Sequence, residues 1–116
     1  MATITRKQKG SRMSGIVIHG DTVYLSGLTA PNATPDVADQ TRQTLEIIDQ
    51  RLAEAGTDKH HILKANIWIS DIRYFDEMNK AWDAWVSEEA PARATVEARL
   101  ARPDLLVEIM VIAVLP

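Results

Sequence analysis

The stretch PARATVEARLARPDLLVEIMVIAVL, Pro91–Leu115, decides how the rest of the chain must fold. Its second half predicts a strand over about Leu106–Leu115, and every residue from Ile109 onward in it is apolar. Because successive side chains of a strand point to opposite faces, both faces of this strand need a cover. Glu108 lies on the face of Met110, where a buried carboxylate is costly unless it meets a cation or water. The alternative is that Glu108 lies near the strand end and reaches solvent.

The first half of the stretch predicts another strand, about Arg93–Ala98, with Arg93 and Thr95 on one face. Arg93 could bind a carboxylate through two parallel hydrogen bonds, and Thr95 could add a third. The alternative for Arg93 is a surface salt bridge. If the two strands formed a simple hairpin, Glu108 would lie beside Glu97, which is unfavourable. We therefore expect either that they are not a hairpin pair or that Arg93 meets Glu108 at a subunit boundary.

Five further segments precede this stretch and complete a ββαβαββ order. Two short apolar segments predict a hairpin with Gly20 in its turn, and a period-two alternation predicts a strand later in the chain. Apolar residues spaced by three and four predict two helices, and we interpret the aromatic residues of the second as core packing. The hairpin strands are Ile16–Ile18 and Val23–Ser26; the first helix begins at Asp36, after Pro35, and ends at Gly56; the third strand is Ile62–Ser70, with Leu63, Ala65, Ile67 and Ile69 on one face; the second helix, capped by Ser70 or Asp71, carries Phe75, Met78, Trp82 and Trp85.

The order predicts a single α+β domain, residues 1–116, with an antiparallel sheet and both helices on one face. Two helices on the same side leave the second face of the last strand uncovered. Another copy of the chain is the economical cover, and burying three or four aliphatic side chains there contributes several kcal/mol at ~25 cal/mol per Å². We therefore expect a homo-oligomer.

Composition narrows the function classes. The chain contains no cysteine, so disulfides, thiolate metal sites and a cysteine nucleophile are excluded. Its net charge of -3 gives no field for nucleic acid, and the basic cluster near the start, RKQKGSR, is interpreted as a solvated segment. No apolar run approaches the roughly 18 residues of a membrane span, so we expect a cytoplasmic protein. His19, His60 and His61 are expected in loops rather than as metal ligands, and no phosphate-binding loop or nucleophile elbow is present.

Four segments carry a resemblance to a known family. VYLSG, FDEMNKAWDAW, PARATVEA and LLVEIMVIA resemble, in order and spacing, the corresponding segments of the RidA/YjgF/UK114 family, most closely its shorter YoaB-type branch. The PAR-x-[TC]-V-E pattern with a glutamate in the last strand is the specific part. The resemblance implies a chorismate-mutase-like α+β fold, a homotrimer with ligand clefts between subunits, and no cofactor.

The resemblance also implies an activity, the hydrolysis of reactive enamines and imines of the 2-aminoacrylate or 2-iminobutyrate type to 2-keto acids and ammonia. Arg93 matches the family arginine that holds the substrate carboxylate, and Glu108 matches the glutamate that positions water. Thr95 stands at a pocket position often held by cysteine, and Ser26 and Asn79 match residues that line or support the pocket. Met13 stands where a tyrosine commonly contacts the ligand, and its thioether cannot donate that hydrogen bond.

Three function classes therefore remain open. An imine deaminase needs both Arg93 and Glu108, whereas a non-catalytic binder of small carboxylate metabolites needs only Arg93. An RNA-directed nuclease or translation inhibitor needs a basic groove, which the charge pattern does not offer.

Overall fold

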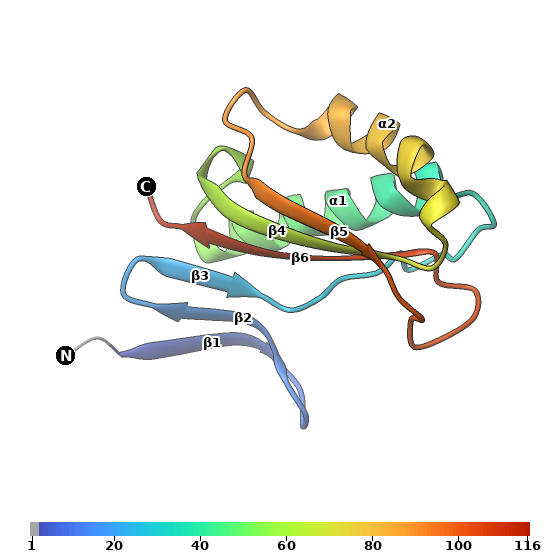
Figure 1. Ribbon diagram of the computed structural model, residues 1–116. Coiled ribbons are helices and arrows are strands. Elements are labelled where there is room, and N and C mark those ends of the chain that lie inside the picture. The colour runs from blue at the N-terminus through green and yellow to red at the C-terminus, as the bar shows by residue number, and fades with distance from the viewer. Residues whose placement is uncertain (1–2) are drawn as a thin grey trace.

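The computed structural model describes residues 3–116, in which six strands form one sheet (Figure 1). The sheet order is β1-β2-β3-β6-β4-β5. The strands are β1 (Ile4–Lys9), β2 (Ser14–His19), β3 (Thr22–Leu25), β4 (Ile62–Ile69), β5 (Ala92–Glu97) and β6 (Val107–Val114), and the helices are α1 (Val37–Ala55) and α2 (Phe75–Trp85), with short 3-10 turns at Lys59–His61 and Ile72–Tyr74. The single domain over residues 1–116 stays a prediction, and its first two residues lie outside the described part.

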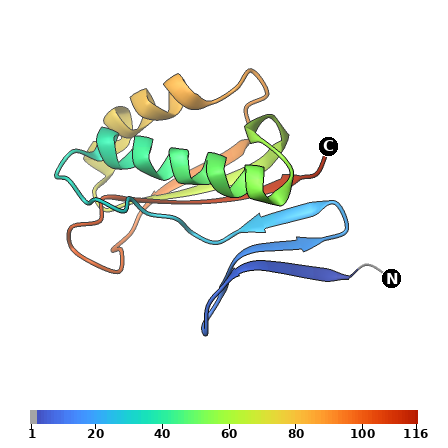
Figure 2. The same ribbon diagram turned by 180° about the vertical axis from the view of Figure 1, so that it is seen from behind.

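Both helices lie on the same face of the sheet, as predicted (Figures 1 and 2). Asp36 caps α1, because its side chain accepts hydrogen bonds from the backbone N–H groups of Ala38 and Asp39. Gly56 ends α1 in the left-handed conformation, with φ 94°, which costs glycine little. The apolar stripe of α1 then packs on the sheet through Leu45, Ile48 and Leu52, which are almost fully buried. The α+β class with two helices on one face is therefore confirmed.

The central strand is β6, which lies between β3 and β4. Its residues Val107, Ile109, Val111 and Ala113 are fully buried beneath the helices. On the other face Met110 remains 37% exposed, and Tyr24 of β3 and Val96 of β5 are exposed on that face as well. Both faces of β6 are therefore apolar in the folded chain, and the face opposite the helices is open.

The predicted antiparallel sheet is wrong for one pair of strands. β5 runs parallel to β4, and β4 separates β5 from β6. The reason is the crossover through α2: a chain that leaves β4, passes along a helix and returns beside β4 runs in the original direction. β5 and β6 are thus not a hairpin, which was one of the two arrangements expected from the clash between Glu97 and Glu108.

The predicted ββαβαββ order omits one strand, which precedes the predicted hairpin in the structure. The basic segment at the start of the chain, interpreted as solvated, forms β1, which pairs antiparallel with β2 at the sheet edge. Charged side chains are common on edge strands, so they obscured the alternation. Long-range contacts anchor this strand, since Lys7 Nζ donates to the carbonyl of Glu54 and Gln8 Nε2 donates to the carboxylate of Glu54.

One residue of the predicted β4 pattern is misplaced. Leu63 is exposed, and Ile62 is buried in its place. An irregularity in the pairing with β6 between Ile62 and Lys64 shifts the alternation by one residue. Ala65, Ile67 and Ile69 face the core as predicted.

Candidate functional site

Arg93 lies on β5 and packs against one side of α2. Its Nη1 donates a hydrogen bond of 2.8 Å to Oδ1 of Asn79. Its Cζ lies 5.2 Å from the ring centroid of Trp82 and 6.0 Å from that of Phe75. Arg93 has no acidic partner within residues 3–116. A guanidinium held by a neutral amide and two rings keeps its positive charge available for an anion.

Thr95 lies two residues along β5, on the same face as Arg93. The pairing shows this directly, because Arg93 lies opposite Ala65, Thr95 lies opposite Ile67, and both partners face the core. Oγ1 of Thr95 is buried and has no hydrogen-bond partner among residues 3–116. A buried hydroxyl without a partner is costly, so this oxygen is suited to a ligand or water.

Glu108 lies on the opposite face of the sheet. It pairs with Trp68 of β4, and Trp68 pairs in turn with Val96 of β5, which is 49% exposed. Arg93 is therefore three residues, roughly 10 Å, along β5 from the level of Glu108, and points to the other side. Within one subunit these two side chains do not share a site.

Of the two remaining predicted residues, Ser26 lies one residue from a contact with Glu108, and Met13 lies in the turn before β2. Gly27 follows β3, and a Cβ on it would lie 3.2 Å from Cδ of Glu108. The neighbouring Ser26 donates its backbone N–H to the carbonyl of Gly15 in β2. Met13 precedes β2 in the hairpin turn, and its side chain is exposed. The predicted residues thus fall into separate groups: Arg93, Thr95 and Asn79 lie on the helix face, Glu108 and Ser26 lie close to Gly27, and Met13 lies in the turn before β2.

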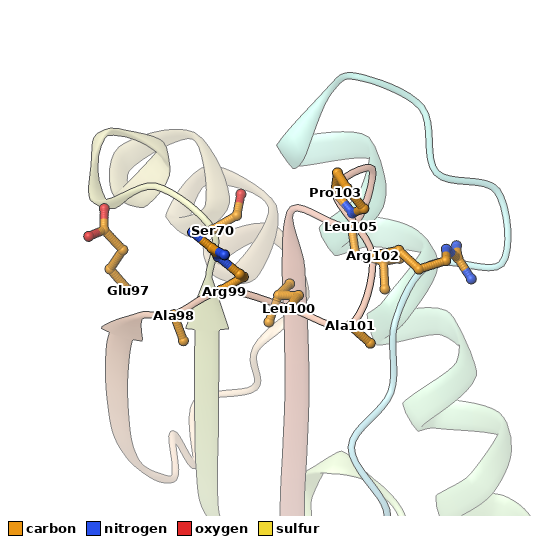
Figure 3. A pocket seen from close by; sticks show the side chains of 9 residues that line it. All are labelled: Ser70, Glu97, Ala98, Arg99, Leu100, Ala101, Arg102, Pro103 and Leu105. Carbon is orange, nitrogen blue, oxygen red and sulfur yellow. The ribbon is translucent and has the colours of Figure 1, made fainter.

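A separate hollow of about 720 Å³ lies beside the connection between β5 and β6. Figure 3 shows its lining side chains, with the Glu97 carboxylate and the Arg102 guanidinium on opposite sides. Both charges are already engaged, because Glu97 accepts from the N–H of Ile72 and Arg102 pairs with Asp104. None of the predicted site residues lines this hollow.

Other candidate chemistry has no support in the described part of the chain. Residues 3–116 contain no group of three or more histidine, aspartate or glutamate side chains placed to hold a metal ion. His61 lies in a 3-10 turn, where its Nδ1 is 2.9 Å from Oδ1 of Asp58. No helix in this part of the chain is both long and apolar enough to cross a membrane.

Sequence reasoning missed the role of two aromatic residues. Phe75 and Trp82 were assigned to core packing, yet their rings lie beside the Arg93 guanidinium. Trp82 is 5% exposed and fits the packing interpretation as well, whereas Phe75 is 37% exposed. A signal was present, because Phe75, Asn79 and Trp82 are spaced by four and three and therefore share one helix face.

Comparison with known proteins gives a consistent result. The family model described as Endoribonuclease L-PSP matches residues 5–115. The RutC family protein YoaB of Escherichia coli is 44% identical over 112 residues, which cover 96% of this chain and 97% of the relative. A RutC family protein of Haemophilus ducreyi is 40% identical over 111 residues, 95% of each chain.

Solved structures of similar fold come from the same family. The crystal structure of a YjgF family member from Neisseria meningitidis superimposes with a TM-score of 0.96 at 43% identity, covering 98% of this chain and 96% of that one. A YjgF/YER057c/UK114 family member from Mycobacterium tuberculosis gives a TM-score of 0.89 at 28% identity, covering 97% and 100%. The resemblance found in four short segments thus extends over nearly the whole chain, and this protein belongs to the RidA/YjgF/UK114 family.

Proposed function

We propose that this protein hydrolyses reactive enamines and imines of small 2-keto acids, of the 2-aminoacrylate or 2-iminobutyrate type, to 2-keto acids and ammonia. The active form is a homotrimer, and each site combines Arg93 and Thr95 of one subunit with Glu108 of the next. The substrate is a small 2-imino acid, and the chemistry needs only side chains of this protein and water.

The observation that carries this proposal is the state of Arg93. Its guanidinium is oriented by Asn79 and by two aromatic rings, and it has no acidic partner within residues 3–116. A fixed, planar cation of this kind binds a carboxylate through two parallel hydrogen bonds. The orphaned hydroxyl of Thr95, on the same strand face, can donate one more hydrogen bond to that carboxylate.

The placement of Glu108 supports a site shared between subunits. Since Arg93 and Glu108 project from opposite faces of one sheet, a ligand on Arg93 can reach Glu108 only from another copy. The open face offers the surface for that contact, because Tyr24, Val96 and Met110 expose apolar groups there. Covering such a face with a second copy removes apolar surface from water and brings Glu108 to the subunit boundary.

The chemistry follows from these positions. Protonation of the imine nitrogen makes the imine carbon electrophilic, and Arg93 fixes the position of this carbon by holding the neighbouring carboxylate. Glu108 takes a proton from a water molecule as the water oxygen forms a bond to that carbon, which gives a carbinolamine. The proton then moves from Glu108 to the nitrogen, the carbon–nitrogen bond breaks, and ammonia leaves as the hydroxyl proton passes to the Glu108 carboxylate and the carbonyl forms. An enamine enters the same route after a proton is added to its terminal carbon.

Two other candidates are compatible with particular observations. The description Endoribonuclease L-PSP of the matching family model favours cleavage of RNA. The net charge of -3 does not favour it, and Lys7 of the basic strand β1 is already bonded to Glu54. A non-catalytic binder of small carboxylates would use Arg93 and leave Glu108 without a chemical role.

The decisive experiment compares wild type with Glu108→Gln. An amino-acid oxidase generates 2-iminobutyrate or 2-iminopropionate in the cuvette, and semicarbazide traps the imine that survives. Glutamine nearly preserves the volume but cannot take the proton, so the variant should bind 2-ketobutyrate and lose on the order of 10²-fold or more in activity. A wild type that leaves the imine lifetime unchanged would make the binder the better assignment, and cleavage of RNA with a steep salt dependence would favour the nuclease.

A further inference from the structure

Gly27 follows β3 and lies against the side chain of Glu108. A Cβ built on Gly27 would lie 3.2 Å from Cδ and 3.5 Å from Cγ of Glu108, and closer still to Oε2. The space that a side chain at position 27 would take is therefore filled by the carboxylate of Glu108.

Backbone conformation does not explain this glycine. Gly20 and Gly56 adopt positive φ, 60° and 94°, where glycine is strongly favoured, but Gly27 is outside that region. A positive φ therefore does not account for glycine at position 27. Only the neighbouring carboxylate requires that the side chain be missing.

The backbone on each side of Gly27 is fixed. Leu28 and Ile109 exchange two hydrogen bonds, of 2.9 and 3.0 Å, and Ser26 donates to the carbonyl of Gly15 at 3.0 Å. Glu108, in contrast, approaches Gly27 with the end of a flexible side chain. When a methyl group is added at position 27, the carboxylate therefore moves and the strands stay in place.

We propose that Gly27 is the positioning residue for the Glu108 carboxylate. The inference rests on the proposed function, in which the place of that carboxylate decides where the attacking water is held. Gly27 does not touch the substrate in this scheme. Because it has no side chain, Gly27 leaves room for the Glu108 carboxylate beside its own Cα. This space limits the rotamers that Glu108 adopts when it transfers a proton.

The first test is Gly27→Ala, with Gly10→Ala as the matched control. A Cβ on Gly10 would lie 3.5 Å from the carbonyl oxygen of Met13, which is ordinary contact, and Gly10 is also outside the positive-φ region. Gly27→Ala should lower kcat on the order of 10²-fold while the affinity for 2-ketobutyrate and the thermal unfolding temperature stay near those of wild type. Gly10→Ala should match wild type in all three. A fully active Gly27→Ala would overturn the inference.

Combined variants test whether Gly27 acts through Glu108. In the Glu108→Gln background, Gly27→Ala should cause little further loss, because the group it displaces no longer acts as a base. Glu108→Asp should restore part of the activity of Gly27→Ala, since the shorter carboxylate clears the methyl group. Independent, additive losses would mean that Gly27 has only a structural role.

A readout without catalysis separates this inference from the proposed function. The ¹³Cδ chemical shift of Glu108, assigned with Glu108→Gln, should change in Gly27→Ala and stay the same in Gly10→Ala. If wild type does not hydrolyse imines and the shift still changes, the function proposed above fails and the positioning by Gly27 stands. An unchanged shift in an active protein would overturn the positioning.

Discussion

The ring of Trp82 lies 5.2 Å from Cζ of Arg93, on the side of the guanidinium that faces α2. Trp82 is nearly buried and Arg93 is half-buried, so the cation rests against a fixed ring rather than in free solution. Asn79, one turn away on the same helix, accepts a hydrogen bond from the same guanidinium. Together these contacts hold the plane of the guanidinium before any ligand arrives.

Trp82→Leu should weaken the binding of 2-ketobutyrate, because leucine fills part of the space but offers no ring to the cation. The contribution of such a contact corresponds to roughly threefold to thirtyfold in affinity. Trp82→Phe keeps a ring and should lose less. Calorimetry measures both affinities, with thermal unfolding as the check that each variant is folded. Equal affinity in Trp82→Leu and wild type would show that the ring does not orient Arg93.

Mixed trimers should recover activity that neither parent variant has. Arg93→Met removes the carboxylate anchor and Glu108→Gln removes the base, so trimers of either variant alone should be nearly inactive. If each site draws these residues from two subunits, one of the three sites in every mixed trimer regains both, so about a third of the sites are active. Co-expression with two different tags isolates the mixed species. Sites confined to one chain would give no recovery.

Ile112→Lys should break the assembly. Ile112 pairs with Tyr24 across β6 and β3 on the open face, and a lysine there would place a charge in an apolar contact. Sedimentation velocity should show a trimer for wild type and smaller species for the variant. Lys64→Arg, at the position opposite Ile112 on β4, keeps the charge and serves as control. A wild-type monomer would contradict the shared site.

Gln40→Met should destabilise the fold. Gln40 is fully buried; its amide donates to the carbonyls of Thr34 and Asp104, and its oxygen accepts from the N–H of Leu106, just before β6. Methionine is similar in size but satisfies none of these groups, at a cost of about 1–3 kcal/mol for each one left buried. Urea unfolding measures the change.

The matched control for that variant is Gln43→Met. Gln43 makes two hydrogen bonds to the backbone of Asn32, but they are exposed to water, which can replace the lost partner. Gln43→Met should therefore cost much less than Gln40→Met. Similar losses in the two variants would mean that the buried network does not anchor the start of β6.

Asp71 should make stability fall in acid. Its hydrogen bonds from Arg73 lower the pKa of Asp71 from 3.8 to about 2. The folded state favours the charged form of Asp71 more than the unfolded state does. The contribution of Asp71 to the free energy of unfolding is therefore present above pH 3.8 and is lost as the pH falls toward 2. Asp71→Asn should flatten the pH dependence of the unfolding free energy in this window. An unchanged slope in Asp71→Asn would contradict the role of the ion pair.

The sequence by itself determined most of the local elements, β1 excepted, and the chemistry of individual residues. Asp36 and Gly56 marked the two ends of α1, because a capping side chain and a left-handed glycine act within a few residues of the chain. The doubly apolar β6 was equally visible, since alternation is a property of consecutive residues. Arg93 and Glu108 stood out for the same reason, as charges within otherwise apolar or alternating strands.

Only the tertiary structure decided which strands are neighbours. The position of β6 between β3 and β4, and the parallel return of β5 beside β4, depend on contacts between residues far apart in the chain. These pairings set Arg93 and Glu108 on opposite faces, bring Phe75 and Trp82 to the guanidinium, and place Gly27 against Glu108. Periodicity gives the face of a residue within its own strand or helix, but the element that packs on that face is selected by the whole fold, because burial is gained only when distant segments come together.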